Sequence, residues 1–190
     1  MRRSKEDTAA TRRSIVGTAS VEFRRSGIAE TALSDIMASV GLTHGGFYRH
    51  FDSKEQLATE ALQLAFDAGL SAMEQWFGSG SSENAVASFV NHYLAPRHRD
   101  DCGNSCPLAA LGSDLRRAEN RTRDVAAAGM ERLVMLLQKQ FAELPLREAK
   151  ARATAIVAAM VGGLMLSRIA NDPGTSNSIL NDTRDLLLQA

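Results

Sequence analysis

The chain has 190 residues and equal numbers of basic and acidic side chains, 22 of each. Hydrophobic residues make up 44% of it and charged residues 23%, which excludes an intrinsically disordered chain. The aromatic content of only 5%, together with plentiful Ala, Leu and Met, favours helices over a sheet of β-branched residues.

The zero net charge conceals a modest asymmetry along the chain. Residues 1–54 carry nine Lys/Arg against six Asp/Glu, whereas residues 55–190 carry thirteen against sixteen. A basic head on an acidic body suits a head that approaches phosphate groups. The N-terminus has no apolar signal segment, and the apolar stretch 155–166 is too short to span a bilayer of about 30 Å. We therefore expect a cytoplasmic protein with no membrane partner.

The N-terminal part is predicted to contain three short helices after a basic arm at residues 1–6. A first helix is expected over residues 7–25 and should end at Gly27. A second amphipathic helix should follow a cap at Thr31 or Ala32 and end at Gly41. Its apolar residues recur at i, i+3, i+4 and i+7: Leu33, Ile36, Met37 and Val40.

A very short third helix and a long fourth helix complete this region. Thr43 is expected to cap the third helix, which should run to about residue 51. Ser53 and Gln56 have the spacing of a capping box, which predicts a fourth helix running to about residue 77.

Five more helices are expected beyond a Gly/Ser loop at residues 78–82. The first ends at Pro96, a polar loop follows at 97–105, and the others span about 106–117, 122–142, 145–170 and 176–189. One face of the 122–142 helix should carry Met130, Leu133, Leu137 and Phe141. No segment alternates at period two. The chain is thus predicted to be all-α with about nine helices. We expect one domain at residues 1–54 and a second at 55–190.

Residues 33–57 have the pattern of a helix-turn-helix. Two short helices meet at residues 40–43, where Gly41 permits the positive φ that a sharp reversal needs. Leu42 and Phe47 can fill the space between the two helices. The second helix then shows a small, polar tip to the outside, which suits the major groove of DNA.

The segment TALSDIMASVGLTHGGFYRHFDSKEQL, residues 31–57, resembles the tetracycline-repressor-like (TetR/AcrR) family of bacterial regulators. The resemblance implies a homodimer, a palindromic double-stranded DNA operator, a small-molecule effector and no cofactor. Residues 1–54 would then form the three-helix helix-turn-helix DNA-binding domain, and residues 55–190 the helical ligand-binding and dimerisation domain. The resemblance also implies roles at matching positions. Phosphate contacts are implied for Thr43, Tyr48, His50 and Lys54, and base contacts for His44, Gly45 and Arg49. Taken singly, residues of this segment have plainer interpretations. Tyr48 and its neighbour Phe51 could simply be core, and Lys54 could be a solvated charge.

One position departs from the family pattern. The family often has Thr or Ser where this chain has Gly46. Gly45 and Gly46 each weaken a helix by roughly 1 kcal/mol. We therefore expect this helix to become firm only on DNA.

The 145–170 helix carries closely spaced small residues, which let two helix backbones approach each other. Either these residues pack within the chain or, as the resemblance implies, they form a four-helix dimer bundle. The dimerisation candidates are Ala155, Ala159, Gly162 and Gly163.

Cys106 opens a predicted helix with Pro107 at its first position, in a stretch that resembles a Gly-Cys-Pro-Leu-Ala-Ala-Leu element of one family branch. Helix N-terminal amides favour a thiolate, which predicts either an electrophile or redox sensor or a structural, pocket-lining cysteine. Cys102 is close enough in sequence for a local disulfide if the loop bends. Further residues could line an effector pocket or simply be core: Trp76, Phe77, Phe89, Tyr93, Met130, Leu133 and Met160.

The sequence therefore predicts a DNA-binding regulator, acting as a repressor that a small hydrophobic or electrophilic effector releases from its operator. An enzyme and a helical adaptor without DNA binding are the alternatives. Paired carboxylates, metal-ligand spacing and a phosphate-binding loop are not found in the sequence, so no catalytic or metal site is predicted.

Overall fold

The computed structural model describes residues 5–78 and 85–189 of the chain. Within these ranges it contains nine α-helices, three short 3-10 helices and no strand. The predicted all-α class is therefore confirmed. The basic arm expected at residues 1–6 and the loop expected at 78–82 lie largely outside the described residues, although Lys5 and Glu6 already belong to the first helix.

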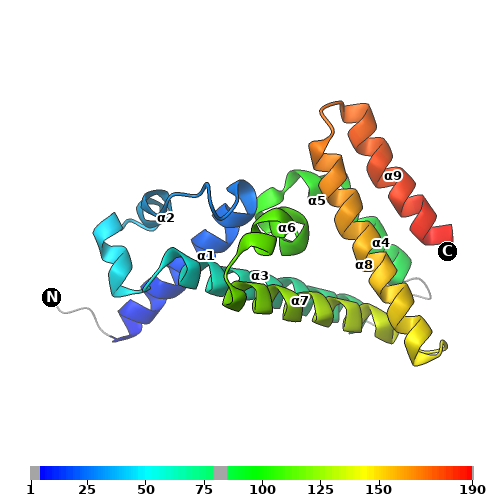
Figure 1. Cartoon of the computed structure of the whole chain (residues 1–190), viewed down its shortest axis with the longest axis horizontal. Helices are drawn as coiled ribbons and strands as arrows, with labels where there is room; N and C mark the ends of the chain where they lie inside the picture. Colours follow the sequence, from blue (N-terminus) through cyan, green and yellow to red (C-terminus); the bar gives the residue numbers. More distant parts are fainter. Residues whose placement is uncertain (1–4, 79–84, 190) are drawn as a thin grey trace.

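One end of the molecule, which we call the head, consists of α1 (Lys5–Ser26), α2 (Leu33–Ser39), the 3-10 helix η1 (His44–Arg49) and the first turns of α3 (Lys54–Gly78) (Figure 1). Gly27 and Gly41 adopt φ values of +90° and +70°, which explains why α1 and α2 end where predicted. The apolar faces of these elements close on a core of their own, formed by Ile15, Ala19, Phe23, Ile36, Met37, Phe47, Phe51, Leu57, Ala58 and Ala61.

The rest of the molecule, which we call the body, surrounds a second core that includes Phe66, Leu94, Leu137, Met160 and Leu164. In it α3 runs along α7, and α8 pairs with α9 at the end farthest from the head (Figure 1). Its elements are α4 (Ala85–Tyr93), α5 (Pro96–Asp100), η2 (Cys102–Asn104), α6 (Pro107–Arg117), α7 (Asn120–Gln138), η3 (Lys139–Phe141), α8 (Leu146–Ile169) and α9 (Pro173–Gln189).

The predicted polar loop at residues 97–105 is wrong, because this segment forms α5 and η2. Pro96 occupies the first turn of α5, where its missing N–H costs nothing. Arg168 from α8 then donates hydrogen bonds of 3.0 Å to the carbonyl groups of His98 and Arg99 at the end of that helix. A partner 69 residues away in sequence thus satisfies carbonyl groups that a short helix leaves open.

Two smaller expectations also need correction. The third helix of the head is a 3-10 helix, and Thr43 precedes it without a side-chain capping bond. Met130 was predicted on the buried face of α7, but it is 44% exposed, whereas Leu133, Leu137 and Phe141 are buried.

Helix α8 has the length and composition of a membrane-spanning helix, being longer than its apolar stretch alone suggested. Its position indicates a core helix instead, because it packs against α6, α7 and α9. Ala153, Met160 and Leu164 on this helix are fully buried in the body.

Candidate nucleic-acid interface and internal cavity

The helix-turn-helix geometry follows from one buried ring. Phe47 of η1 is fully buried in the head core with Ile36 and Met37 of α2. It stacks on Phe51 with ring centroids 5.5 Å apart. Phe51 is therefore core, as the plainer interpretation had it. These contacts fix η1 across α2 and turn its opposite face to solvent.

The outward face of η1 presents most of the residues predicted to contact DNA. Tyr48 is 64% exposed, so the interpretation of this residue as core is wrong. Its ring packs edge-on against Phe47, with centroids 5.2 Å apart, and this contact orients the exposed hydroxyl. The other members of the exposed set are Thr43, His44, Gly45 and Arg49.

His50 and Lys54, the remaining predicted phosphate contacts, are half-buried. Lys54 Nζ donates a hydrogen bond of 2.9 Å to the carbonyl oxygen of Ala29. An ammonium group has three donors, so two remain for a phosphate. The predicted capping box is present in altered form. Ser53 Oγ accepts from the N–H of Gln56 at 3.0 Å, while Gln56 Oε1 accepts from the N–H of Asp52 at 2.7 Å.

Arg12 was not predicted as a key residue, yet it joins three elements of the head. Its guanidinium lies 4.4 Å from the ring centroid of Phe51. Nη2 donates to Glu60 Oε1 at 2.6 Å, Nη1 donates to the other carboxylate oxygen, and Nε donates to the His50 carbonyl at 3.3 Å. The hydrogen bond with Glu60 raises the pKa of Arg12. Arg12 and Glu60 are 48 residues apart, so sequence spacing gave no signal for this pair.

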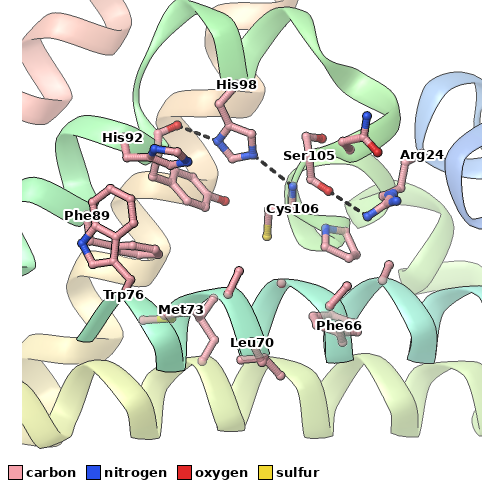
Figure 2. Close-up of a pocket in the computed structure, with 18 residues that line it drawn as sticks. Arg24, Phe66, Leu70, Met73, Trp76, Phe89, His92, His98, Ser105 and Cys106 are labelled. Carbon is pink, nitrogen blue, oxygen red and sulfur yellow. Dashed lines mark hydrogen bonds between the residues drawn. The ribbon is translucent and has the colours of Figure 1, made fainter. Parts of the chain in front are cut away.

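The body contains a cavity of about 430 Å³ between α3, α4 and the α5–α6 segment (Figure 2). Small residues on α3 leave this space open, because Ala65, Ala68, Gly69 and Ala72 line it at i, i+3, i+4 and i+7. A Cβ atom added at Gly69 would meet nothing within 4 Å. The volume of this cavity and its mostly apolar walls are typical of a site for a small molecule.

The cavity brings together most of the predicted pocket residues. Trp76, Phe89, Tyr93, Cys106 and Leu133 all line it. The expectation for the others is corrected. Met130 lies on the exposed surface, Met160 is fully buried in the core, and Phe77 packs against that core without lining the cavity.

His98 organises the polar wall of this cavity (Figure 2). Its Nδ1 lies 2.7 Å from the Tyr93 carbonyl oxygen, and its Nε2 accepts a hydrogen bond of 3.1 Å from the N–H of Cys106. A carbonyl only accepts and an amide only donates, so these contacts require the neutral ring with its proton on Nδ1. Burial lowers the pKa of His98, and the charge of Arg168 adds to that effect, although the bond with Tyr93 opposes it.

The Tyr93 hydroxyl is buried beside the Cys106 thiol, a weak hydrogen-bond partner, and has no stronger partner among the described residues. Burial raises the pKa of Tyr93 well above its usual value, and the nearby Cys106 side chain adds to the effect. Cys106 precedes α6, as predicted, but makes no side-chain capping bond. Cys106 and Cys102 are both free thiols, and Cys102 Sγ contacts the Arg99 carbonyl at 3.6 Å.

The cavity wall is joined directly to the head. Arg24 of α1 lines the cavity, and its Nη1 donates to the Ser105 carbonyl at 3.4 Å (Figure 2). Gly103 packs so tightly on α1 that an added Cβ would lie 2.8 Å from Val21 Cγ1. Asp114 of α6 accepts a hydrogen bond of 2.9 Å from the N–H of Ile28, just after α1.

The four predicted dimerisation residues of α8 do not share one environment. Gly163 is buried, and an added Cβ would lie 2.9 Å from Thr183 Oγ1 of α9, so this glycine serves packing within the chain. A Cβ at Gly162 would meet nothing within 4 Å, Ala159 is half-buried and Ala155 is exposed. Large apolar side chains are also exposed on these two helices: Leu166, Ile169, Leu186 and Leu188. Among the described residues, no three His, Cys, Asp or Glu side chains group as metal ligands.

Comparison with known proteins agrees with this architecture. Residues 15–61 match the family model of bacterial regulatory proteins, tetR family, and residues 83–175 match that of the LmrA/YxaF-like transcriptional regulator C-terminal domain. Over 62 residues the chain is 39% identical to the HTH-type transcriptional regulator TtgR of Pseudomonas putida. This alignment covers 33% of this chain and 30% of that protein. The first curated relatives are thus matched over less than a third of their length.

A longer alignment relates nearly the whole chain to a regulator of Mycobacterium tuberculosis. The HTH-type transcriptional regulator Rv0196 is 24% identical over 185 residues, covering 93% of this chain and 94% of that protein. Among solved structures, a TetR transcriptional regulator of Chloroflexus aurantiacus has a TM-score of 0.76 at 27% identity, covering 97% and 95% of the two chains. Reduced Escherichia coli NemR has a TM-score of 0.79 at 17% identity, covering 94% and 95%, which shows the shared fold.

Proposed function

The chain belongs to the TetR family of bacterial transcriptional regulators, and from that premise we propose that it is a homodimeric repressor released from its operator by a small molecule. DNA binding through the helix-turn-helix is a property of the family. Because the family consists of DNA-binding regulators and not of enzymes, this membership argues against both alternatives, an enzyme and an adaptor without DNA binding. Repression, the dimer and the effector are our inferences.

The observation that supports release by an effector is the contact between cavity and head. Arg24 lines the cavity and also belongs to α1, whose inner face carries Ile15, Ala19 and Phe23 of the head core. A molecule that displaces the 102–107 segment therefore acts on α1, which shares the head core with Phe47 of the DNA-binding element η1. Effectors of this kind shift the equilibrium only if they bind the two states with different affinity.

We propose that the exposed face of η1 enters the major groove. Arg49 and His44 would read base edges beside Gly45, and Thr43, Tyr48, His50 and Lys54 would bind phosphates. A dimer through the outer faces of α8 and α9 would present two heads, which matches a palindromic operator.

Selection of bound fragments from bacterial genomic DNA tests the DNA-binding proposal. The recovered site should be palindromic, and its affinity should fall steeply as salt rises, because bound phosphates release counterions. Tyr48→Phe should weaken all sequences alike, whereas Arg49→Ala should change the preferred base by about 1–3 kcal/mol. If Arg49→Ala weakened binding to all sequences equally, Arg49 would contact phosphates and not bases.

Filling the cavity tests the effector proposal. Gly69→Leu places a large side chain into open space, and Leu is the better helix former by about 1 kcal/mol, so the fold should be kept. This variant should repress normally in a reporter strain and fail to respond to inducers found by screening. Gly69→Ala is the matched control and should still respond. Equal induction of both variants would place the effector elsewhere.

A second candidate signal is an electrophile, favoured by the position of Cys106 in the cavity wall beside the Tyr93 hydroxyl. The Cys106 thiolate would add to an α,β-unsaturated carbonyl compound. A sulfur–carbon bond forms at the β carbon, the carbon–carbon π bond breaks, and the α carbon takes a proton from water. Cys106→Ser should bind DNA and ignore the electrophile, whereas Cys102→Ser should respond normally. Slow alkylation of Cys106 in the native protein, with DNA binding unchanged, would reject this candidate.

A further inference from the structure

The cavity has one cationic end. Arg24 is the only Arg, Lys, Asp or Glu among the described residues that line it. Nε donates to the Ser20 carbonyl at 2.9 Å and Nη1 to the Ser105 carbonyl at 3.4 Å. Within the described ranges Arg24 forms no ion pair, and Nη2 donates no hydrogen bond. The guanidinium thus has neutral partners and free donors.

The charge of Arg24 is only partly compensated by its surroundings. Burial lowers the pKa of Arg24, while the charges of Cys106 and Asp101 act in the opposite direction. Asp101 accepts hydrogen bonds of 3.1 Å from the side-chain amide of Asn104. An arginine remains protonated under these conditions, so the end of the cavity carries a positive charge. Helix α6 begins at Pro107 on the same wall and adds the positive end of its dipole.

A second donor lies deeper in the same cavity. Tyr93 is 5% exposed and lines the cavity, and its hydroxyl has no hydrogen-bond partner among the described residues stronger than the Cys106 thiol. A buried hydroxyl without a strong partner is destabilising, and a ligand acceptor would remove that penalty. The polar part of the wall therefore offers hydrogen-bond donors, one of them charged.

The opposite end of the cavity is aromatic, and the His92 imidazole lies there with its ring centroid 5.0 Å from that of Trp76. Figure 2 shows Trp76 and Phe89 at one end and Arg24 at the other, with Cys106 and His98 between them. Phe66, Leu70 and Met73 form the floor along α3. This arrangement fits a molecule with an apolar body and one anionic group.

We propose that the cavity binds a small apolar organic acid, whose carboxylate pairs with Arg24 and whose apolar part lies against Phe66, Met73 and Trp76. This inference rests on the proposed effector site and names the chemical class of its ligand. A guanidinium binds a carboxylate through two parallel N–H donors; here Nη2 makes no hydrogen bond with the described residues and Nη1 makes only the long bond of 3.4 Å to Ser105.

The same contact supplies the signal to the head. A carboxylate at Arg24 competes with the Ser105 carbonyl for Nη1, because the existing bond is long at 3.4 Å. Its loss frees the 102–107 segment from α1 at the point where Gly103 packs on Val21. The acid would therefore be sensed by the side chain that ties the body to α1 of the head.

Fluorescence of the single tryptophan, Trp76, measures occupancy independently of DNA. The probes are decanoate, 4-phenylbutyrate and 1-naphthylacetate, each titrated against its primary amide with the full chain at pH 7.5. At least one acid should bind about tenfold or more tightly than its amide, the size expected for a charged hydrogen-bonded pair. Isothermal titration calorimetry provides the dissociation constants.

Variants identify Arg24 as the source of the preference. Arg24→Gln keeps a donor for Ser105 but removes the charge, so acid and amide should bind alike. Arg25→Gln is the matched control on the same helix, because Arg25 is exposed and pairs with Glu22 at 2.5 Å. Tyr93→Phe should weaken acid and amide together.

Two results would overturn the inference: no acid binding more tightly than its amide, or an acid preference that survives Arg24→Gln. Operator binding, measured on the same preparations, separates this result from the proposed repressor function. Acid and amide binding equally would reject the inference and leave the effector cavity intact. An Arg24-dependent acid preference without any operator binding would reject repression and leave the inference standing.

Discussion

Arg12 joins α1, η1 and α3, and its removal should loosen the DNA-binding face. Arg12→Ala loses the contact with Glu60, the bond to the His50 carbonyl and the cation–π contact with Phe51. We expect a loss of about 1 kcal/mol or more in the free energy of unfolding, measured by urea denaturation. Arg13→Ala, at an exposed neighbouring position, is the control. Equal stability of the two variants would show that Arg12 does not hold the head together.

His98 should make the stability of the body depend on pH. The fold requires the neutral ring, and burial lowers the pKa of His98 below the ordinary value of 6.5. Below pH 6.5 the unfolded chain binds a proton at His98 that the folded chain does not yet bind. The free energy of unfolding therefore decreases as the pH falls from 6.5 to the folded-state pKa. The unfolding free energy of His98→Gln should therefore vary less between pH 7 and 5. His44→Gln, at an exposed position, should keep the full pH dependence.

At the scale of helices, the two adjacent glycines of α8 should behave differently. Gly163→Leu would collide with Thr183 and separate α8 from α9, which should cost about 1–3 kcal/mol or more in stability. Gly162→Leu meets open space within the chain, so it should leave the fold intact and disrupt only the proposed dimer. Sedimentation and thermal unfolding distinguish these outcomes. A stable dimer of Gly162→Leu would remove this face from the interface.

Most helices could be predicted because their signals are local. Gly27 and Gly41 mark helix ends through their own backbone geometry, and the spacing of Leu33, Ile36 and Met37 shows one buried face. Helix α5 could not be predicted in this way. Its carbonyl groups are satisfied by Arg168, which only the packing of α8 brings near.

The candidate sites show the same division between local and distant signals. The exposed residues of η1 lie within one short motif, so their grouping could be predicted. Arg24 and Ser105 are 81 residues apart, and no periodicity links them. The pocket candidates were chosen by residue type alone, which failed for Met130 and Met160 because type does not reveal which side of a helix meets a cavity.

At the scale of the whole molecule, Asp114 should control how firmly the head docks on the body. Asp114→Ala leaves the N–H of Ile28 without its acceptor, which should cost about 1–3 kcal/mol and speed hydrogen exchange at this amide. Asp114→Asn retains an acceptor oxygen and should exchange slowly. Fast exchange in both variants would mean that the negative charge, rather than the hydrogen bond, holds the turn after α1.

Helix α3 passes through both cores without interruption, and this determines how the protein could be rebuilt. Its residues up to Ala61 pack in the head core, whereas Leu62 is the first to join the body core. A chimera that grafts this head onto another sensor should therefore be joined between these two residues. It should also preserve the buried hydrogen bond of 2.7 Å between Thr59 and Thr122, since the graft inherits one side of that contact and the new sensor must supply the other.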